Sequence, residues 1–331
     1  MQEQHELVVE PDDFSDGDSA IGATDTESST ASLNSSILDY RKENGRTYHK
    51  FHDGQYHLPN DAAENERLDL QHHIFYLTLN GKLGFAPPNE PKANVGRVLD
   101  LGTGTGIWAM DFGDEHPDAE VVGVDLSPIQ PQFVPPNVHF EIDDFEEEWT
   151  FSKPFNYIHS RMNNCSISNW EEYVRQSFKN LAPGGYVEFQ EFDLPLSDDG
   201  TLGPTHALHR SMRHLGEAAM KLNRALIDLN TLKPMLEEAG FEDVREYHYK
   251  WPSNTWPRDA KFKELGAWNH ENIVTGLQGF LMAFLTRGLG WTPDEVNVLA
   301  AEAKKDMRDK LIHAYWPIIV VTGRKPGDKE V

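Results

Sequence analysis

The sequence has little of what would tie a chain to a membrane or to an oxidising compartment. Its single cysteine, Cys165, cannot form an internal disulfide. The longest apolar runs, near residues 280–285 and 317–321, are far shorter than the roughly 20 residues that a membrane-spanning helix needs. The first residues show neither the basic nor the apolar region of a signal peptide. We therefore expect a soluble protein of a reducing compartment, with no membrane partner.

Basic residues are also scarce. The chain has 30 Lys and Arg against 54 Asp and Glu, a formal net charge of −24. Non-specific affinity for nucleic acid comes from cations that displace counterions from the phosphates. The charge therefore predicts no nucleic-acid partner. Without a basic cluster the chain has no nuclear import signal of its own. The predicted location therefore stays open between the cytoplasm and the nucleus.

The acidic excess is concentrated at the N-terminus. Residues 1–40 hold ten Asp and Glu and no Lys or Arg. Large apolar side chains are nearly absent there, so burial cannot offset the entropy lost on ordering. We predict that residues 1–38 form a disordered, acidic, Ser/Thr-rich tail and that one domain occupies 39–331. The tail is either a solubilising segment or one that binds protein partners.

Beyond the tail, short apolar strands alternate with helices, which is typical of an α/β fold with a mostly parallel sheet. Asp61 and Glu64 form a capping-box pattern at the start of the first expected helix. The expected strands are 97–101, 120–126, 137–142, 156–160, 186–192, 242–250 and 315–323, the last antiparallel. The expected helices are 62–80, 107–114, 169–181, 204–226, 229–239, 258–287 and 293–313. Segments 62–80, 204–226 and 251–314 are predicted to form a helical cap over the sheet.

A glycine-rich turn carries the clearest chemical signal. Strand 97–101 runs into Gly102-Thr103-Gly104-Thr105-Gly106, which opens a helix. Glycines let the backbone turn sharply and let a ligand lie against it, beside the positive end of the helix. Asp125 ends the next strand, where a carboxylate can accept hydrogen bonds from both ribose hydroxyls. This pattern predicts a Rossmann-like fold that binds a nucleoside cofactor.

The same glycines also fit a nicotinamide dinucleotide fingerprint, but neighbouring acids favour a different cofactor. Asp100 lies two residues before the first glycine, where a carboxylate suits a cationic amino group better than a pyrophosphate. Asp143 and Asp144 follow the third strand, and Asp144 is the better placed to accept from an adenine amino group. With the turn at 181–185, this set resembles the class I S-adenosylmethionine-dependent methyltransferases, whose motifs occur in this order.

Longer segments narrow the resemblance to the fungal LaeA-like methyltransferases. These segments are 43–49, 58–61, 67–69, 102–108, 125–131 and 158–161, and the likeness covers about residues 38–325. Two positions depart from the expected pattern, with Ala62 in place of an acid and Asn156 in place of an aspartate. The resemblance implies a seven-stranded class I methyltransferase fold and S-adenosylmethionine as cofactor.

The resemblance leaves the function open between three hypotheses. The preferred one is methylation of a small-molecule secondary metabolite on oxygen, nitrogen or carbon. The second is a regulator of secondary metabolism that acts through protein partners. The third is an enzyme of the pericyclase type, which binds the same cofactor without transferring its methyl group.

Candidate site residues follow from the strand ends and the resemblance. His159 and Glu191 lie near the ends of strands and are candidates for a general base. His72 and His73 are not expected to bind a metal, because adjacent helical residues point about 100° apart. Five aromatic residues either line an acceptor pocket or pack as core: Tyr48, Tyr56, Trp251, Trp256 and Trp268. The residues assigned to the cofactor are Tyr48, Asp100, Gly102, Thr103, Gly104, Gly106, Asp125, Leu126, Asp143, Asp144, Phe145, Ser160 and Arg161.

Overall fold

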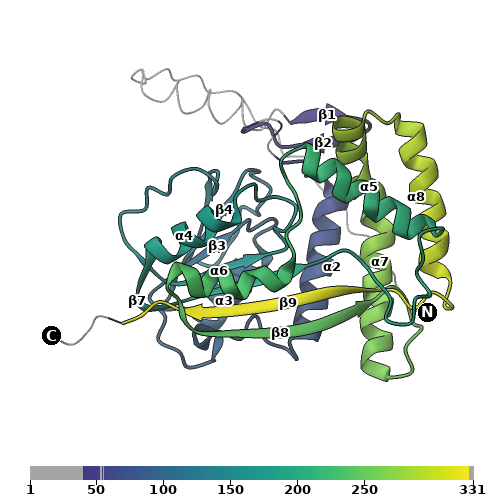
Figure 1. Ribbon diagram of the computed structural model, residues 1–331. Helices are drawn as coiled ribbons and strands as arrows, with labels where there is room; N and C mark the ends of the chain where they lie inside the picture. Colours follow the sequence, from purple (N-terminus) through teal and green to yellow (C-terminus); the bar gives the residue numbers. More distant parts are fainter. Residues whose placement is uncertain (1–39, 53, 55, 328–331) are drawn as a thin grey trace, which may run out of the picture. The chain divides into compact units, whose positions relative to one another are not determined.

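The computed structural model describes residues 40–52, 54 and 56–327, so the predicted tail at 1–38 lies outside the described residues. The described residues belong to one compact unit, which spans 37–331 (Figure 1). No helix among them is long and apolar enough to cross a membrane.

A seven-stranded sheet forms the centre of this unit, as predicted. Its strand order is β5-β4-β3-β6-β7-β9-β8. The first five strands in that order pair in parallel, and β9 pairs antiparallel with both β7 and β8. The carboxyl ends of the parallel strands therefore share one edge, where ligands bind in open α/β sheets. The strand bounds are β3 Arg97–Leu101, β4 Glu120–Asp125, β5 Val138–Ile142, β6 Phe155–Arg161, β7 Leu181–Phe192, β8 Glu242–Pro252 and β9 Tyr315–Arg324.

Helices cover both faces of the sheet because strand side chains alternate between the faces. On β3, Val98 packs in a core with α3 (Ile107–Glu115), and Leu99 packs in a second core with α4 (Trp170–Asn180) and α6 (Leu232–Ala239). Both side chains are fully buried. The central strands are thus covered on both sides, which explains their continuous apolar runs.

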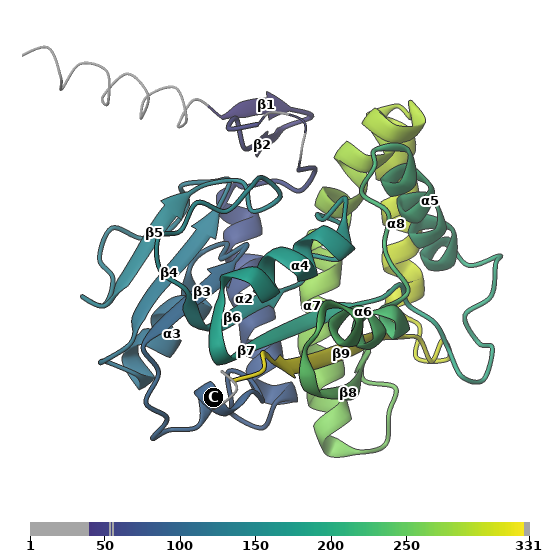
Figure 2. The same cartoon turned by 60° about the vertical axis from the view of Figure 1, so that its left-hand side comes forward.

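Four further helices form a cap with its own core (Figure 2). They are α2 (Ala62–Thr78), α5 (Ala207–Lys221), α7 (Ala260–Ala283) and α8 (Pro293–Arg308). A π-helical turn, η3 (Phe284–Gly288), extends α7. The segment that carries α7, η3 and α8 leaves β8 at Pro252 and returns at Tyr315, and these two residues are register partners.

Several element ends differ from the sequence prediction. The helix predicted at 204–226 covers only α5, because a turn at 203–206 precedes it and Asn223 takes a positive φ of 57°. The helix predicted at 62–80 ends at Thr78. Asp61 caps it by accepting from the Glu64 amide, but the Glu64 carboxylate accepts from Arg67 and completes no capping box.

One predicted turn lies inside a strand rather than before it, and some smaller elements were not predicted. The turn at 183–185 lies inside β7, where a register shift against β6 absorbs it. Two strands of three residues, β1 (Arg41–Glu43) and β2 (Arg46–Tyr48), form a hairpin before α2. Two 3-10 turns, η1 (Pro87–Asn89) and η2 (Leu229–Thr231), complete the described elements.

Candidate functional site

One cavity lies at the carboxyl edge of the parallel strands and continues under the cap. It encloses about 1630 Å³ of space between its walls, the open solvent at its mouth included. We divide it into a cofactor half and a cap half by the residues that line each. The cofactor half is lined by Asp100, Gly102, Thr103, Gly104, Thr105, Asp125, Leu126, Asp144 and Phe145. The cap half is lined by Gln71, Phe192, Met212, Leu215, Trp251, Asn269, Asn272, Phe280, Phe284, Trp316 and Ile318.

The glycine loop connects β3 to α3 with three residues in the left-handed region of φ. Gly102 and Gly104 line the cavity, but Gly106 does not. At Gly106, with φ 80°, an added Cβ would lie 2.3 Å from the Phe140 ring. Packing of the loop against β5 therefore requires glycine at 106. At Gly102 an added Cβ would lie 2.8 Å from the Asn163 amide oxygen, and at Gly104 the nearest atom would be a Leu68 methyl at 3.4 Å, so Gly104 leaves the backbone most open to a ligand.

Asp125 is held in place by the loop that it faces. One carboxylate oxygen accepts from the Gly104 amide at 2.8 Å, and the other accepts from the Ser127 amide at 2.9 Å. Desolvation by burial raises the pKa of Asp125 to about 6. Its remaining lone pairs are available for hydroxyl donors in the cavity, which suits a ribose.

Asp100 is braced from two sides at the base of the loop. The Thr103 hydroxyl donates to one carboxylate oxygen at 2.6 Å, and Nδ1 of His159 lies 2.7 Å from the other. The His159 ring is fully buried and stacks on Trp108 with a centroid separation of 3.7 Å. His159 does not line the cavity. His159, which was predicted as a candidate base, therefore orients Asp100.

Glu191, the second candidate base, also lies outside the cavity lining. Its two carboxylate oxygens accept from the Asn163 and Asn164 amides, each at 3.0 Å. Burial raises the pKa of Glu191 to about 8. The side chain therefore shapes the turn that follows β6, and neither sequence candidate for a base reaches the space where an acceptor would bind.

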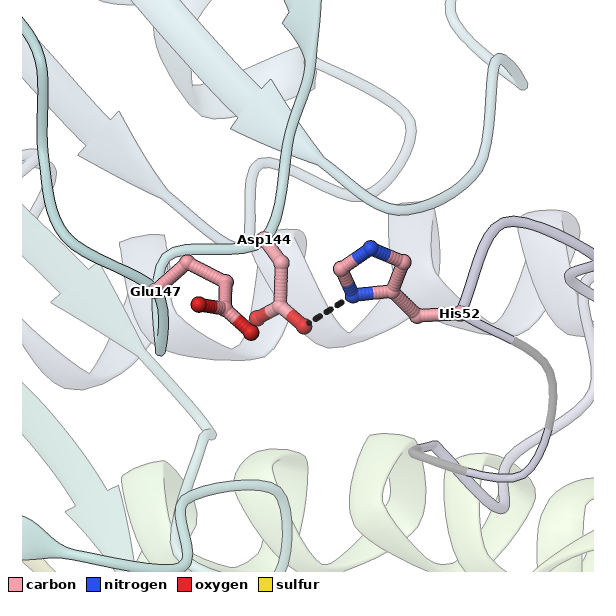
Figure 3. A group of neighbouring side chains, drawn as sticks. All are labelled: His52, Asp144 and Glu147. Carbon is pink, nitrogen blue, oxygen red and sulfur yellow. Dashed lines mark hydrogen bonds and ion pairs between the residues drawn. The ribbon is translucent and has the colours of Figure 1, made fainter.

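The loop after β5 brings Asp144 to the mouth of the cofactor half, while Asp143 does not line the cavity. One Asp144 oxygen accepts from the Glu146 amide at 2.9 Å, and the other lies 2.9 Å from Nδ1 of His52. Figure 3 shows His52 approaching Asp144 beside Glu147. Ligand atoms of these three residues lie within 4.8 Å of one another, but only their composition points to an ion, so we assign no metal there.

Arg161 lines the cavity between its two halves. Two of its N–H groups donate to Nδ1 of His72, each at 3.2 Å, and Nε2 of His72 lies 2.9 Å from Asp111. Burial lowers the pKa of His72, consistent with a neutral ring whose Nδ1 accepts. Burial also lowers the pKa of Arg161 to about 10. Among the described residues, no carboxylate lies within hydrogen-bonding distance of Arg161.

Other predicted residues lie outside the cavity. Ser160 is fully buried and its hydroxyl accepts from Tyr173 and Asn163. Tyr48 is buried beneath Arg287, and Tyr56 lines the cavity instead. Ser160 and Tyr48, which were predicted to contact the cofactor, therefore contact other protein residues and do not line the cavity.

Of the tryptophans, Trp251 lines the cavity as predicted. Trp256 instead donates its indole N–H to the Ala314 carbonyl, and Trp268 packs edge-on against His73.

The sequence interpretation missed much of the polar wall. Gln71 and Arg67 reach the cavity from α2, and Asn269 and Asn272 reach it from α7. The two asparagines are fully buried in an otherwise apolar helix face, and this is the signal that could have singled them out. The turn after β6 adds Met162, Asn163, Cys165 and Ser166.

Comparison with known proteins gives consistent results. A family model described as a methyltransferase domain matches residues 70–246. Methyltransferase pytC of Aspergillus terreus is 40% identical over 321 residues, covering 96% of this chain and 98% of the relative. Secondary metabolism regulator LAE1 of Cochliobolus heterostrophus is 37% identical, covering 86% of this chain and 94% of the relative. Protein-methionine methyltransferase laeA of Emericella nidulans is 35% identical, covering 89% of this chain and 79% of the relative.

Proposed function

Because this chain belongs to the fungal LaeA-like family of S-adenosylmethionine-dependent methyltransferases, we propose that it methylates a small molecule bound in the cap half of the cavity. The observation that carries this proposal is the single cavity that joins the glycine loop to an aromatic wall under the cap. Small-molecule sites are typically apolar clefts with a few converging polar groups, and the cap half has this composition.

The charged residues of the cavity fit the cofactor. We assign the ribose hydroxyls to Asp125 and the adenine amino group to Asp144. We assign the ammonium of the amino-acid end to Asp100 and its carboxylate to Arg161. The other cavity arginines, Arg67 and Arg224, already have carboxylate partners in Glu64 and Glu146. Arg161 is thus the cavity cation with unused capacity for an anion, among the residues that the structure describes.

The cofactor supplies an electrophilic methyl group, and transfer by direct displacement depends mainly on alignment and exclusion of water. The described residues that line the cavity include no His or Lys. Its carboxylates, on Asp100, Asp125, Asp144 and Glu146, are each engaged by a protein donor. We infer that the chain contributes orientation and a dry pocket and uses no dedicated base.

The decisive experiment is incubation of the full chain with methyl-labelled cofactor and a fungal extract, followed by separation of small molecules from protein. We expect label in the small-molecule fraction, and none with an Asp100→Ala control. Label confined to protein would replace the proposal by a protein acceptor. Binding of the cofactor without labelling of either fraction would favour the regulator or the non-methylating enzyme.

Two finer assignments remain predictions. The cytoplasmic or nuclear location rests on composition alone. The acidic residues 1–38 are proposed as a segment for protein partners or as a solubilising tail.

A further inference from the structure

The cap half of the cavity has flat, apolar walls. Trp251 on β8 and Trp316 on β9 are register partners, so their side chains leave the same face of the strand pair. Both line the cavity, as does Ile318 two residues further along β9. Met212 from α5 and Phe280 from α7 line it as well. These walls suit a planar, largely apolar ligand.

The charges beside these walls are compensated within the protein. Arg67 donates to Glu64 through Nε at 2.9 Å and through one terminal nitrogen at 2.7 Å. Its other terminal nitrogen donates to Asn272 at 2.8 Å. Arg161, under the proposed function, meets the carboxylate of the cofactor. With cofactor bound, the cap half therefore presents no uncompensated charge to an acceptor.

Gln71 is a polar group of the cavity wall that the described part of the protein leaves without a partner. It is only 6% exposed and lines the cavity, yet its amide has no hydrogen-bond partner among the described residues. Helices α2 and α7 pair antiparallel, since Arg67 contacts Asn272 and His73 packs on Trp268. This pairing places Gln71 opposite the part of α7 that lies between Trp268 and Asn272. The Gln71 amide atoms therefore face the cavity, where a ligand can supply the hydrogen bonds that the described residues do not.

We propose that Gln71 anchors a subsite for an uncharged, planar acceptor that carries an amide, lactam or similar carbonyl group. The primary amide of Gln71 offers both a donor and an acceptor, so it can form two complementary hydrogen bonds to such a group. The aromatic walls hold the ring system, and the compensated charges disfavour an acidic or basic acceptor. This inference rests on the proposed function, because it takes the cofactor half as filled.

The test compares three probes that share one ring system and differ in the charge and hydrogen-bonding groups of one substituent. These are 2-naphthamide, 2-naphthoate and 2-naphthylmethylammonium, titrated into the full chain saturated with S-adenosylhomocysteine and followed by calorimetry. We expect the amide to bind at least tenfold more tightly than either ion. Gln71→Leu should weaken amide binding at least tenfold and leave the affinity for S-adenosylhomocysteine within twofold. Gln132→Leu, an exposed glutamine outside this cavity, is the matched control and should change nothing.

A second variant keeps the test decisive if Gln71→Leu fails to fold. Gln71→Glu places a charge at the same point and should shift the preference to the ammonium probe. Tightest binding of the naphthoate, equal binding of all three probes, or an unchanged preference in Gln71→Glu would overturn the inference. Failure of the wild-type chain to bind S-adenosylhomocysteine would instead refute the proposed function, so the two failures are distinguishable.

Discussion

Lowering the pH should weaken cofactor binding through Asp125. The Gly104 and Ser127 amides each donate to one of its carboxylate oxygens. The ionised carboxylate can accept from both ribose hydroxyls as well, whereas the protonated group loses acceptor capacity. Because its pKa is raised to about 6, the free protein gains a proton as the pH falls through 6. One unit below that value, about ten molecules in eleven are protonated, so Kd should rise about tenfold between pH 7.5 and pH 5.

The assay is calorimetric titration of S-adenosylhomocysteine at pH 7.5, 6.5, 5.5 and 5.0, with Asp125→Asn as the companion variant. Loss of hydrogen bonds to a charged group costs about 1.5–3 kcal/mol, so the variant should bind about 10- to 150-fold more weakly at pH 7.5. Its affinity should then show little further change as the pH falls.

Two results would refute this reasoning. A wild-type Kd that stays constant from pH 7.5 to pH 5 would show that Asp125 remains ionised throughout. A variant that titrates with the wild-type midpoint would assign the effect to another group.

Three further predictions test the structural roles assigned above. His159→Ala removes the stack on Trp108 and the brace on Asp100, so chemical denaturation should show a loss of about 2–4 kcal/mol in the free energy of unfolding; unchanged stability would contradict this structural role. Glu191 keeps a proton in the folded chain up to about pH 8 that the unfolded chain releases near its ordinary pKa, so unfolding free energy should fall as the pH rises between these values. The fall of unfolding free energy with pH should be smaller in Glu191→Gln. An equal fall in the variant and the wild type would show that another group causes it. Gly106→Ala should cost about 2–5 kcal/mol through backbone strain and overlap with a ring, whereas Gly184→Ala, at a similar φ in open space, should cost about 1–2 kcal/mol; equal losses would contradict the packing argument.

The sheet was predictable because its strands are local, apolar and bounded by turn residues. The bounds of β3 match the predicted 97–101, and the antiparallel last strand was also predicted correctly. The hairpin of β1 and β2 was missed although its two-residue turn, Asn44-Gly45 with both residues at positive φ, is a local hairpin signal. Its contacts with the rest of the chain, in contrast, were not predictable. Arg287 bonds to Glu43 across more than two hundred residues, and Arg46 pairs with Asp61. Nothing within a short window of sequence encodes such contacts.

The cofactor loop was also predictable, since glycines, a strand and a following acid form one local pattern. The candidate bases were assigned by position at strand ends, and position does not determine the direction of a side chain. His159 points to the face of the sheet that α3 covers, where its ring stacks on Trp108. Gln71 was missed for a related reason: helical spacing identifies a buried face but does not tell which buried residue borders empty space.

The point at which α7 and α8 join the sheet lets one part of the cap vary independently of the strands. Pro252 and Tyr315 face each other on paired strands, so the chain leaves the sheet and returns at almost the same place. A few residues would be enough to connect them. The 62 residues between them, which carry α7 and α8, can therefore be lengthened, shortened or exchanged while the strand register is preserved. Insertion at such a junction lets the α7 wall of the cavity change within one continuous stretch of coding sequence, while α2, α5 and the sheet supply the other walls.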